Sequence, residues 1–269
     1  MKLSKLIPPP FRQFLRDRMT VFVYTYQFRP SPVIEEQTLK FRFEGRQLAV
    51  TSNHRTPLYD TILEVVDYDC YQLKKIQWDP SRPPCIVDIG ANVGVSALVL
   101  SQIPQSHVTC YEPDPENCTL LRRNLEQNNV TNTQVFEAAV ADINGTLKFQ
   151  TCPESVGGHL LRADSATGAD TRIVAAVNLD RVLEQCGSHD VDLIKCDCEG
   201  GEYALIEQMT PEHAARVRNL SIEVHDLDRV RNIQTISNKL TMLGYNLSVI
   251  PDMWERSALH LVLASRAKP

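Results

Sequence analysis

The segment from Asp88 to Gly94 interrupts an apolar stretch with groups that can do chemistry. In VDIGANVGVSALVL, a strand-like run meets an acid, an amide and two glycines before a helix-like run begins. A purely structural turn needs one glycine and one cap, so Asp88 and Asn92 indicate that something other than protein lies against the turn. The turn lacks the G-x-G-x-x-G spacing that brings a backbone against a pyrophosphate, which argues against a nicotinamide enzyme.

A second acid, Glu112, ends the next strand-like run, VTCYEP. At this distance from the first turn, a carboxylate can accept hydrogen bonds from both ribose hydroxyls of a nucleoside. Asp88 would then hold a cationic or hydrogen-bond-donating part of the same ligand. S-adenosylmethionine offers such groups: an amino group, a sulfonium and a ribose. The alternatives are that Asp88 is a helix cap and that Glu112 is an exposed strand end.

Two later strand ends carry candidate catalytic groups. Asp197 and Glu199 follow the apolar run VDLIK, while Glu223 and His225 end the run SIEVH. Strand alternation places Glu223 and His225 on one face, where the acid can orient the ring. An imidazole with an unperturbed pKa of about 6.5 suits a general base for a hydroxyl acceptor. Two alternatives stay open: Asp197 and Glu199 serve the start of the next helix, or all four side chains collect a divalent cation such as magnesium.

Strand-like and helix-like segments alternate from Cys85 onward, which predicts a mostly parallel sheet covered by helices on both faces. The closing segments YNLSVI and ALHLVLAS have no helix between them and predict an antiparallel hairpin at one edge. The preceding region contains a hairpin signal at Glu44-Gly45, one amphipathic helix and the Pro-rich DPSRPP. The predicted organisation is an amino-terminal cap over 1–84 on the substrate side and an α/β domain over 85–269.

Composition is that of an ordinary globular protein. The 269 residues carry a net charge of −5, so no overall positive field draws the chain to nucleic acid. Eight scattered cysteines suit a reducing compartment better than a disulfide framework. The basic amino terminus has three prolines where a signal peptide needs an apolar stretch, and TVFVYTYQF is too short to span a bilayer. We expect a cytoplasmic protein without a transmembrane segment or structural metal, and the sequence is compatible with a homodimer.

Five segments resemble successive motifs of the FkbM-type methyltransferases, a branch of the Rossmann-like, S-adenosylmethionine-dependent methyltransferases. They are VDIGANVGVSALVL, CYEPDPENCTLLRRNLEQNN, AAVADINGTLKF, VNLDRVL and VDLIKCDCEGGEYALIE, in the family's order and spacing. Departures are Cys196 and Cys198, where aliphatic residues are usual, and Glu137, where asparagine is frequent. The resemblance implies a doubly wound, mostly parallel seven-stranded sheet and methyl transfer to a hydroxyl of a small molecule, sugar or secondary metabolite.

The sequence therefore predicts two sets of site residues. The cofactor-binding set is Asp88, Gly90, Ala91, Asn92, Gly94, Glu112, Pro113, Asp142 and Asp197. The catalytic set is His225, Asp197, Glu199 and Glu223. Asp142 is included because it follows the third strand, where the exocyclic amine of adenine would lie, although it also fits a turn cap.

Two rival functions are kept. One is an N-methyltransferase acting on nucleic acid or an amine, against which the absence of an N-P-P-Y-like sequence after DLIK argues. The other is a non-catalytic nucleoside-binding module on the same fold. The loop-like stretch ESVGGHLLRADSATGADTR, which contains His159, is predicted to help the cap shape the acceptor pocket.

Overall fold

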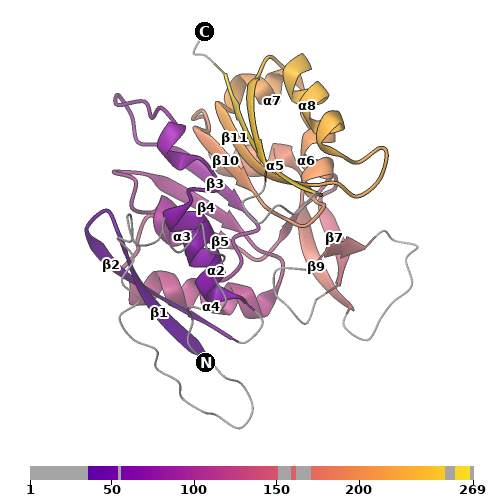
Figure 1. The fold of residues 1–269 in the computed structure, drawn as a ribbon. Helices are drawn as coiled ribbons and strands as arrows, with labels where there is room; N and C mark the ends of the chain where they lie inside the picture. The colour runs from indigo at the N-terminus through magenta and orange to yellow at the C-terminus, as the bar shows by residue number, and fades with distance from the viewer. Residues whose placement is uncertain (1–35, 54–55, 151–158, 162–170, 252–257, 267–269) are drawn as a thin grey trace, which may run out of the picture.

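The computed structural model describes residues 36–53, 56–150, 159–161, 171–251 and 258–266, and a twisted sheet of seven strands lies at its centre (Figure 1). The strands of this central sheet, in chain order, are β3 (Cys85–Ile89), β4 (His107–Tyr111), β5 (Thr133–Phe136), β10 (Leu193–Cys196), β11 (Asn219–His225), β12 (Asn246–Pro251) and β13 (Leu259–Ser265).

Across the central sheet the strands stand in the order β12-β13-β11-β10-β3-β4-β5. All neighbours from β11 to β5 pair in parallel, whereas β13 is antiparallel to both β11 and β12. The Rossmann-like, mostly parallel seven-stranded sheet with an antiparallel edge hairpin is thereby confirmed.

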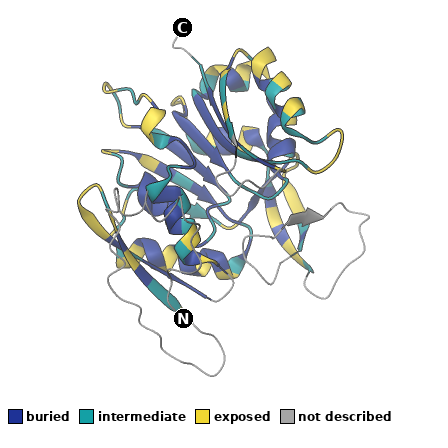
Figure 2. Cartoon of the chain, viewed as in Figure 1, coloured by how far each residue is buried: buried dark blue, intermediate teal, exposed yellow. Residues whose placement is uncertain are grey.

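Helices cover both faces of the central sheet. They are α2 (Leu58–Ile62), α3 (Val95–Leu100), α4 (Pro115–Gln127), α5 (Leu179–Gln185), α6 (Glu202–Gln208), α7 (Pro211–Arg216) and α8 (Ile233–Met242). Side chains alternate along each strand, so Ile86 of β3 belongs to the apolar cluster that includes residues of α3 and α4, while its neighbour Val87 belongs to the cluster that includes residues of α5 to α8. Figure 2 shows the result, buried strands between helices whose outer faces are exposed.

A second, four-stranded sheet stands beside the first. Its strands are β6 (Ala139–Val140), β7 (Gly145–Gln150), β8 (His159–Leu161) and β9 (Thr171–Val177), in the order β6-β9-β7-β8. The strand-forming residues of TQVFEAAV, positions 133–140, predict a single strand, and this prediction is wrong. The segment divides at Glu137–Ala138 between β5 of the central sheet and β6 of the second one, and the continuous run of strand-forming residues gives no signal of the break.

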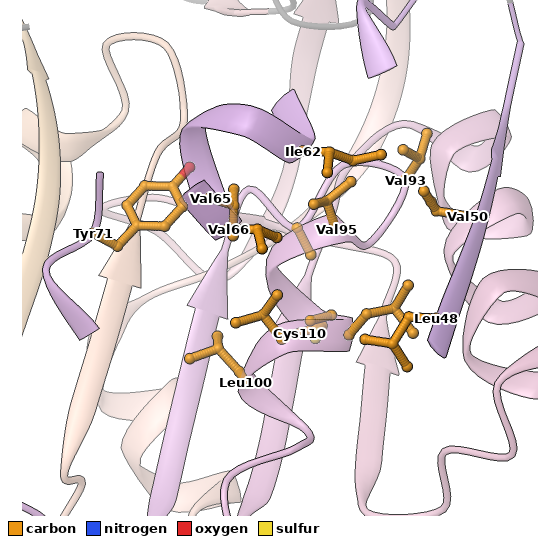
Figure 3. Packing of buried hydrophobic residues seen from close by; sticks show 14 of the residues in the cluster. Leu48, Val50, Ile62, Val65, Val66, Tyr71, Val93, Val95, Leu100 and Cys110 are labelled. Carbon is orange, nitrogen blue, oxygen red and sulfur yellow. The ribbon is translucent and has the colours of Figure 1, made fainter. Parts of the chain in front are cut away.

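The predicted hairpin at Glu44-Gly45 is confirmed as β1 (Gln37–Phe43) and β2 (Arg46–Ser52), paired antiparallel. The predicted helix after it is α2, which continues into η2 (Leu63–Asp67). Leu48 and Val50 of β2 join the apolar cluster around α3 (Figure 3). The side chain of Asn124 on α4 bonds the backbone N–H and C=O of Thr51 and the C=O of Val93. This part of the amino-terminal region therefore packs on the α/β core.

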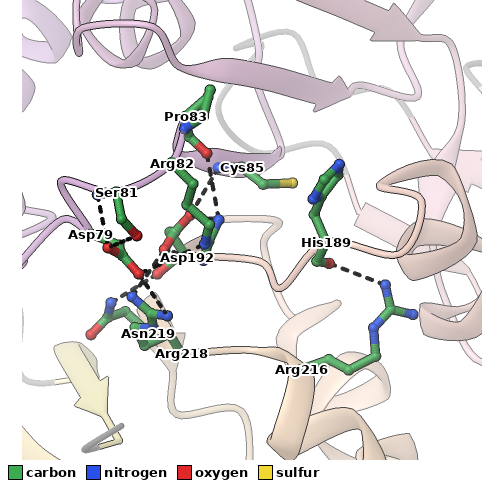
Figure 4. A network of polar contacts seen from close by, with 10 residues as sticks. All are labelled: Asp79, Ser81, Arg82, Pro83, Cys85, His189, Asp192, Arg216, Arg218 and Asn219. Carbon is green, nitrogen blue, oxygen red and sulfur yellow. Dashed lines mark hydrogen bonds and ion pairs between the residues drawn. The ribbon is translucent and has the colours of Figure 1, made fainter.

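A polar network links the chain just before β3 to the residues that directly precede β10 and β11, at the amino ends of these strands (Figure 4). Both terminal nitrogens of Arg82 donate to the Asp192 carboxylate at 2.7 Å. Arg218 lies 3.4 Å from Asp192 and 3.8 Å from Asp79. The predicted boundary between 84 and 85 is therefore bridged by side chains, while residues 1–35 of the predicted cap lie outside the described residues. Within the described part of the chain, no helix could cross a lipid bilayer.

Candidate functional site

The strand order reverses between β3 and β10, and the candidate site lies at the carboxyl ends of these strands. From β3 the chain proceeds to β4 and β5 on one side, and from β10 to β11 on the other. In doubly wound sheets, ligands bind in the crevice at this reversal point. All predicted site residues except Asp142 lie on β3, β4, β10 and β11 or in the loops that follow them.

Gly90 and Gly94 allow protein segments to approach the turn after β3. Their φ angles are +75° and +96°, in the left-handed region that glycine tolerates. A Cβ on Gly90 would lie 1.7 Å from the carbonyl oxygen of Asp197, and one on Gly94 would lie 2.5 Å from Leu121 Cδ1. A side chain at either position would therefore collide with protein atoms. Backbone contacts from this turn to a cofactor stay a prediction.

Asp88 is fully buried, and protein groups hold both of its carboxylate oxygens. Oδ2 accepts a hydrogen bond from Ser96 Oγ at 2.7 Å, and Oδ1 lies 3.1 Å from Lys195 Nζ. Lys195 Nζ also donates to the carbonyl oxygen of Gly90 at 2.9 Å. Burial lowers the pKa of Lys195, but the negative charges of Asp88 and Asp197 outweigh it, and the pKa is raised. No side chain caps α3, so Asp88 is not its helix cap; it anchors the lysine that holds the turn.

Glu112 joins the turn after β4 to the turn after β3. Its Oε2 accepts from the backbone N–H of Asn92 at 2.8 Å, and Oε1 accepts from the backbone N–H of Asp114 at 2.9 Å. Burial raises the pKa of Glu112 to about 7, although these hydrogen bonds act in the opposite direction. Glu112 is therefore a buried carboxylate and not an exposed strand end.

The remaining predicted cofactor residues lie in different surroundings. Ala91 is buried, Pro113 is half-buried, and Asn92 is half-buried with a φ of +49°. Asp142 is exposed and lies in the loop after β6, beyond Ala141. His159, predicted to face the acceptor, has a side chain outside the described residues.

Asp197 stands where β10 ends, directly against the turn after β3. Its backbone N–H donates to Ile89 O at 3.1 Å, and its Oδ2 accepts a hydrogen bond from the Tyr71 hydroxyl at 2.8 Å. The cap of α6 is Gly201, with no side-chain hydrogen bond, so Asp197 does not cap this helix. The placement of its carboxylate in the binding and catalytic site stays a prediction.

His225 is surrounded by carboxylates. Nε2 lies 3.3 Å from Glu199 Oε2 and 3.5 Å from Glu223 Oε1, while Nδ1 lies 3.3 Å from Glu202 Oε1. Burial lowers the pKa of His225, but Glu202 and Glu199 outweigh it and raise the pKa to about 9. The predicted grouping of Glu223 with His225 on one face is confirmed. Among the described residues, no group of three or more His, Cys, Asp or Glu side chains could hold a metal ion.

The raised pKa of His225 predicts a pH-dependent stability. The unfolded ring has its ordinary pKa of about 6.5, so the contribution to the free energy of unfolding is complete below that pH and is lost as pH rises through about 9. The shift corresponds to a loss of about 3 kcal/mol. Urea unfolding between pH 6 and pH 10 should show this loss in the wild type and not in His225→Gln. Parallel stability curves for the two proteins would contradict the assignment.

Three residues near the predicted site residues belong to neither of the two predicted sets. Tyr71 comes from the loop after η2, 126 positions before its partner Asp197, and no local pattern signals such a contact. Glu202 opens α6 and is fully buried, accepting from the backbone N–H of His225 at 2.9 Å. For Lys195 the sequence leaves two alternatives, an ammonium that extends from the strand edge to solvent or one that neutralises nearby acids, and its distance of 3.1 Å from Asp88 Oδ1 supports the second.

Comparison with known proteins agrees with this architecture. The family model described as the methyltransferase FkbM domain matches residues 88–247. Methyltransferase sdnD of Sordaria araneosa is 25% identical over 233 residues, covering 76% of this chain and 88% of that protein. Methyltransferase 1 of Beauveria bassiana is 23% identical over 202 residues, covering 67% and 80%.

Among solved structures, the N-terminal domain of human METTL16 in complex with SAH has a TM-score of 0.43 and 13% identity, covering 79% of this chain and 69% of that one. The family model matches more than half of the chain. The chain therefore belongs to the FkbM methyltransferase family of S-adenosylmethionine-dependent enzymes.

Proposed function

We propose that this chain transfers a methyl group from S-adenosylmethionine to a hydroxyl oxygen of a small molecule. The observation that supports this most directly is the position of Asp197. Its backbone carbonyl touches the turn after β3 at Gly90, and its carboxylate lies beyond the end of β10. A hydroxyl is a poor nucleophile at neutral pH, so an oxygen acceptor needs a base at this position.

The groups at the site fit the proposed cofactor, which supplies an electrophilic methyl carbon when it is bound. Its ribose carries hydroxyl donors, and its amino group and sulfonium carry positive charge. Glu112 can receive a ribose hydroxyl, because a carboxylate has about four acceptor positions and three of them are occupied here, two by backbone N–H groups and one by the side-chain amide of Asn117 at 3.4 Å. The carboxylates of Asp197, Glu199 and Glu223 supply negative charge that suits a cationic ligand.

Replacing Glu112 by glutamine should weaken binding of S-adenosylhomocysteine about 10- to 100-fold at pH 8, because charge-assisted hydrogen bonds are lost. The affinity of the wild type for S-adenosylhomocysteine should fall as pH drops through about 7, because Glu112 becomes protonated there. The affinity of Glu112→Gln should show no such pH dependence. Titration calorimetry at several pH values measures both effects. The exposed Glu116 on α4 provides the control Glu116→Gln. Equal affinities for the two variants would overturn the role of Glu112.

We assign the proton-accepting role to Asp197. His225, with a pKa of about 9, carries protons on both ring nitrogens at neutral pH and accepts none there. The imidazolium instead holds Glu199, Glu202 and Glu223 together by charge. Asp197 is half-buried, so part of the residue is open to solvent.

The acidic residues of the site also favour a small acceptor over a nucleic acid. Glu199, Glu223 and Asp197 gather at the strand ends, and the chain as a whole carries a net charge of −5. A polyphosphate backbone binds through clustered lysine and arginine side chains. The edge of the sheet where we propose methyl transfer instead gathers these negatively charged carboxylates.

A panel of small alcohols, phenols, sugars and amines, incubated with S-adenosylmethionine carrying a deuterated methyl group, tests the proposal. Mass spectrometry and NMR would place the label on oxygen of a hydroxylated acceptor. Asp197→Asn should abolish label transfer at pH 7.5, whereas His225→Gln should retain part of it. Label found on nitrogen alone, or full transfer by Asp197→Asn, would refute the proposal.

A further inference from the structure

Tyr71 reaches the site from outside the region of the chain that the FkbM domain model covers. Its hydroxyl donates to Asp197 Oδ2 at 2.8 Å. Its ring lies under the ammonium of Lys195, with Nζ 5.0 Å from the ring centroid. Its backbone carbonyl accepts a hydrogen bond from Ser221 Oγ of β11 at 2.8 Å. Three independent contacts thus fix the hydroxyl, the ring and the backbone of one residue.

The surroundings keep the Tyr71 phenol protonated. Only 7% of the residue is exposed. Burial raises its pKa, and the negative charges of Asp197 and Glu223 raise it further. The phenol is therefore a permanent donor and not a proton acceptor, and its one proton is directed at Asp197.

This hydrogen bond leaves the two oxygens of Asp197 unequal. Oδ2 receives the Tyr71 hydroxyl, whereas no side chain or backbone group of the described residues donates to Oδ1. A carboxylate held at one oxygen cannot rotate freely, so the other oxygen keeps a fixed direction. Anchoring of this kind preorganises a base before its substrate arrives.

We infer that Tyr71 is a positioning residue that anchors Asp197 Oδ2 and so presents Oδ1 to the acceptor hydroxyl. The amino-terminal region thereby completes the site instead of only covering it. This inference rests on the proposed function, because it assigns Asp197 the role of base. It concerns the direction of the Asp197 carboxylate and leaves Glu112 and its backbone hydrogen bonds unchanged.

The test is Tyr71→Phe, which keeps the ring over Lys195 and removes only the hydroxyl. Tyr245→Phe is a matched control. Tyr245 is also buried, and its hydroxyl donates a 2.8 Å hydrogen bond to the backbone carbonyl of Val217 and not to Asp197. In Tyr71→Phe, kcat should fall about 10- to 100-fold with unchanged affinity for S-adenosylhomocysteine. The acidic limb of the kcat profile should move to higher pH, since the charged carboxylate has lost a donor. Tyr245→Phe should change neither.

A second measurement needs no acceptor. In protein labelled with ¹³C-aspartate, the carboxyl resonance of Asp197, assigned with Asp197→Asn, should shift in Tyr71→Phe and not in Tyr245→Phe. An unshifted resonance, or a pH profile that matches the wild type, would overturn the inference. If the wild type methylates no hydroxyl in the panel, the proposed function fails, and the resonance still decides whether Tyr71 positions Asp197.

Discussion

Gly90→Ala should be among the most damaging single substitutions in this chain, with a loss of more than about 4 kcal/mol of stability. The methyl group would lie 1.7 Å from the carbonyl oxygen of Asp197, at a φ of +75°. Both partners are backbone at the ends of neighbouring parallel strands, so neither can move away without breaking the pairing of β3 with β10. Urea unfolding and binding of S-adenosylhomocysteine should both report the damage.

Gly187→Ala is the control for this experiment. Gly187, which follows α5, has a φ of +72°, and a Cβ there would meet nothing within 4 Å. It therefore shares the left-handed conformation without the clash, and only the conformational strain of about 1–2 kcal/mol should appear. Equal destabilisation by the two substitutions would show that conformation alone, and not the approach of Asp197, requires glycine at position 90.

Lys195→Met should cost about 3–5 kcal/mol of stability, because it leaves the Asp88 carboxylate buried without its positive partner. Asp88 is fully buried, and Lys195 is 1% exposed. The same substitution removes the hydrogen bond from Nζ to the carbonyl of Gly90, so cofactor affinity should also fall. Urea unfolding followed by circular dichroism measures the first effect, and calorimetry with S-adenosylhomocysteine measures the second.

The double variant Asp88→Asn/Lys195→Met separates charge from packing. Neutralising Asp88 removes the uncompensated charge, so the double variant should be more stable than Lys195→Met alone. If the double variant is as unstable as the single one, the cost comes from the lost packing of the lysine stem, and the ion pair contributes little.

The central sheet and the switch point could be predicted from local pattern. Apolar strand runs such as CIVDIG, each followed by a turn and a helix, require a parallel sheet. In such a sheet the residues at strand ends must share one edge, which is why the sequence could predict that Glu112, Asp197 and His225 lie there. The second sheet escaped prediction because nothing local separates β5 from β6.

The contacts within the site could be predicted only in part. The pairing of Glu223 with His225 follows from strand alternation. The charge state of the ring also depends on Glu202, which lies on α6 and contacts His225 only through the tertiary fold. The sequence singled out Gly90 and Gly94 but could not show that a Cβ at either position would collide with Asp197 or Leu121. The role of Tyr71 could not be predicted, because Tyr71 and Asp197 are 126 positions apart and no local sequence pattern indicates that they meet.

Strand β13 lies between β11 and β12 although it follows both in the sequence. On the ribosome, β11 and β12 are therefore made before the strand that separates them. Until β13 inserts, β11 presents one unpaired edge, with Ile222 and Val224 among the side chains that the finished sheet buries. Unpaired edges of this kind associate readily with other chains. Insertion of β13 should thus be a late folding step, and nascent or carboxyl-terminally shortened chains should depend on chaperones to stay in solution.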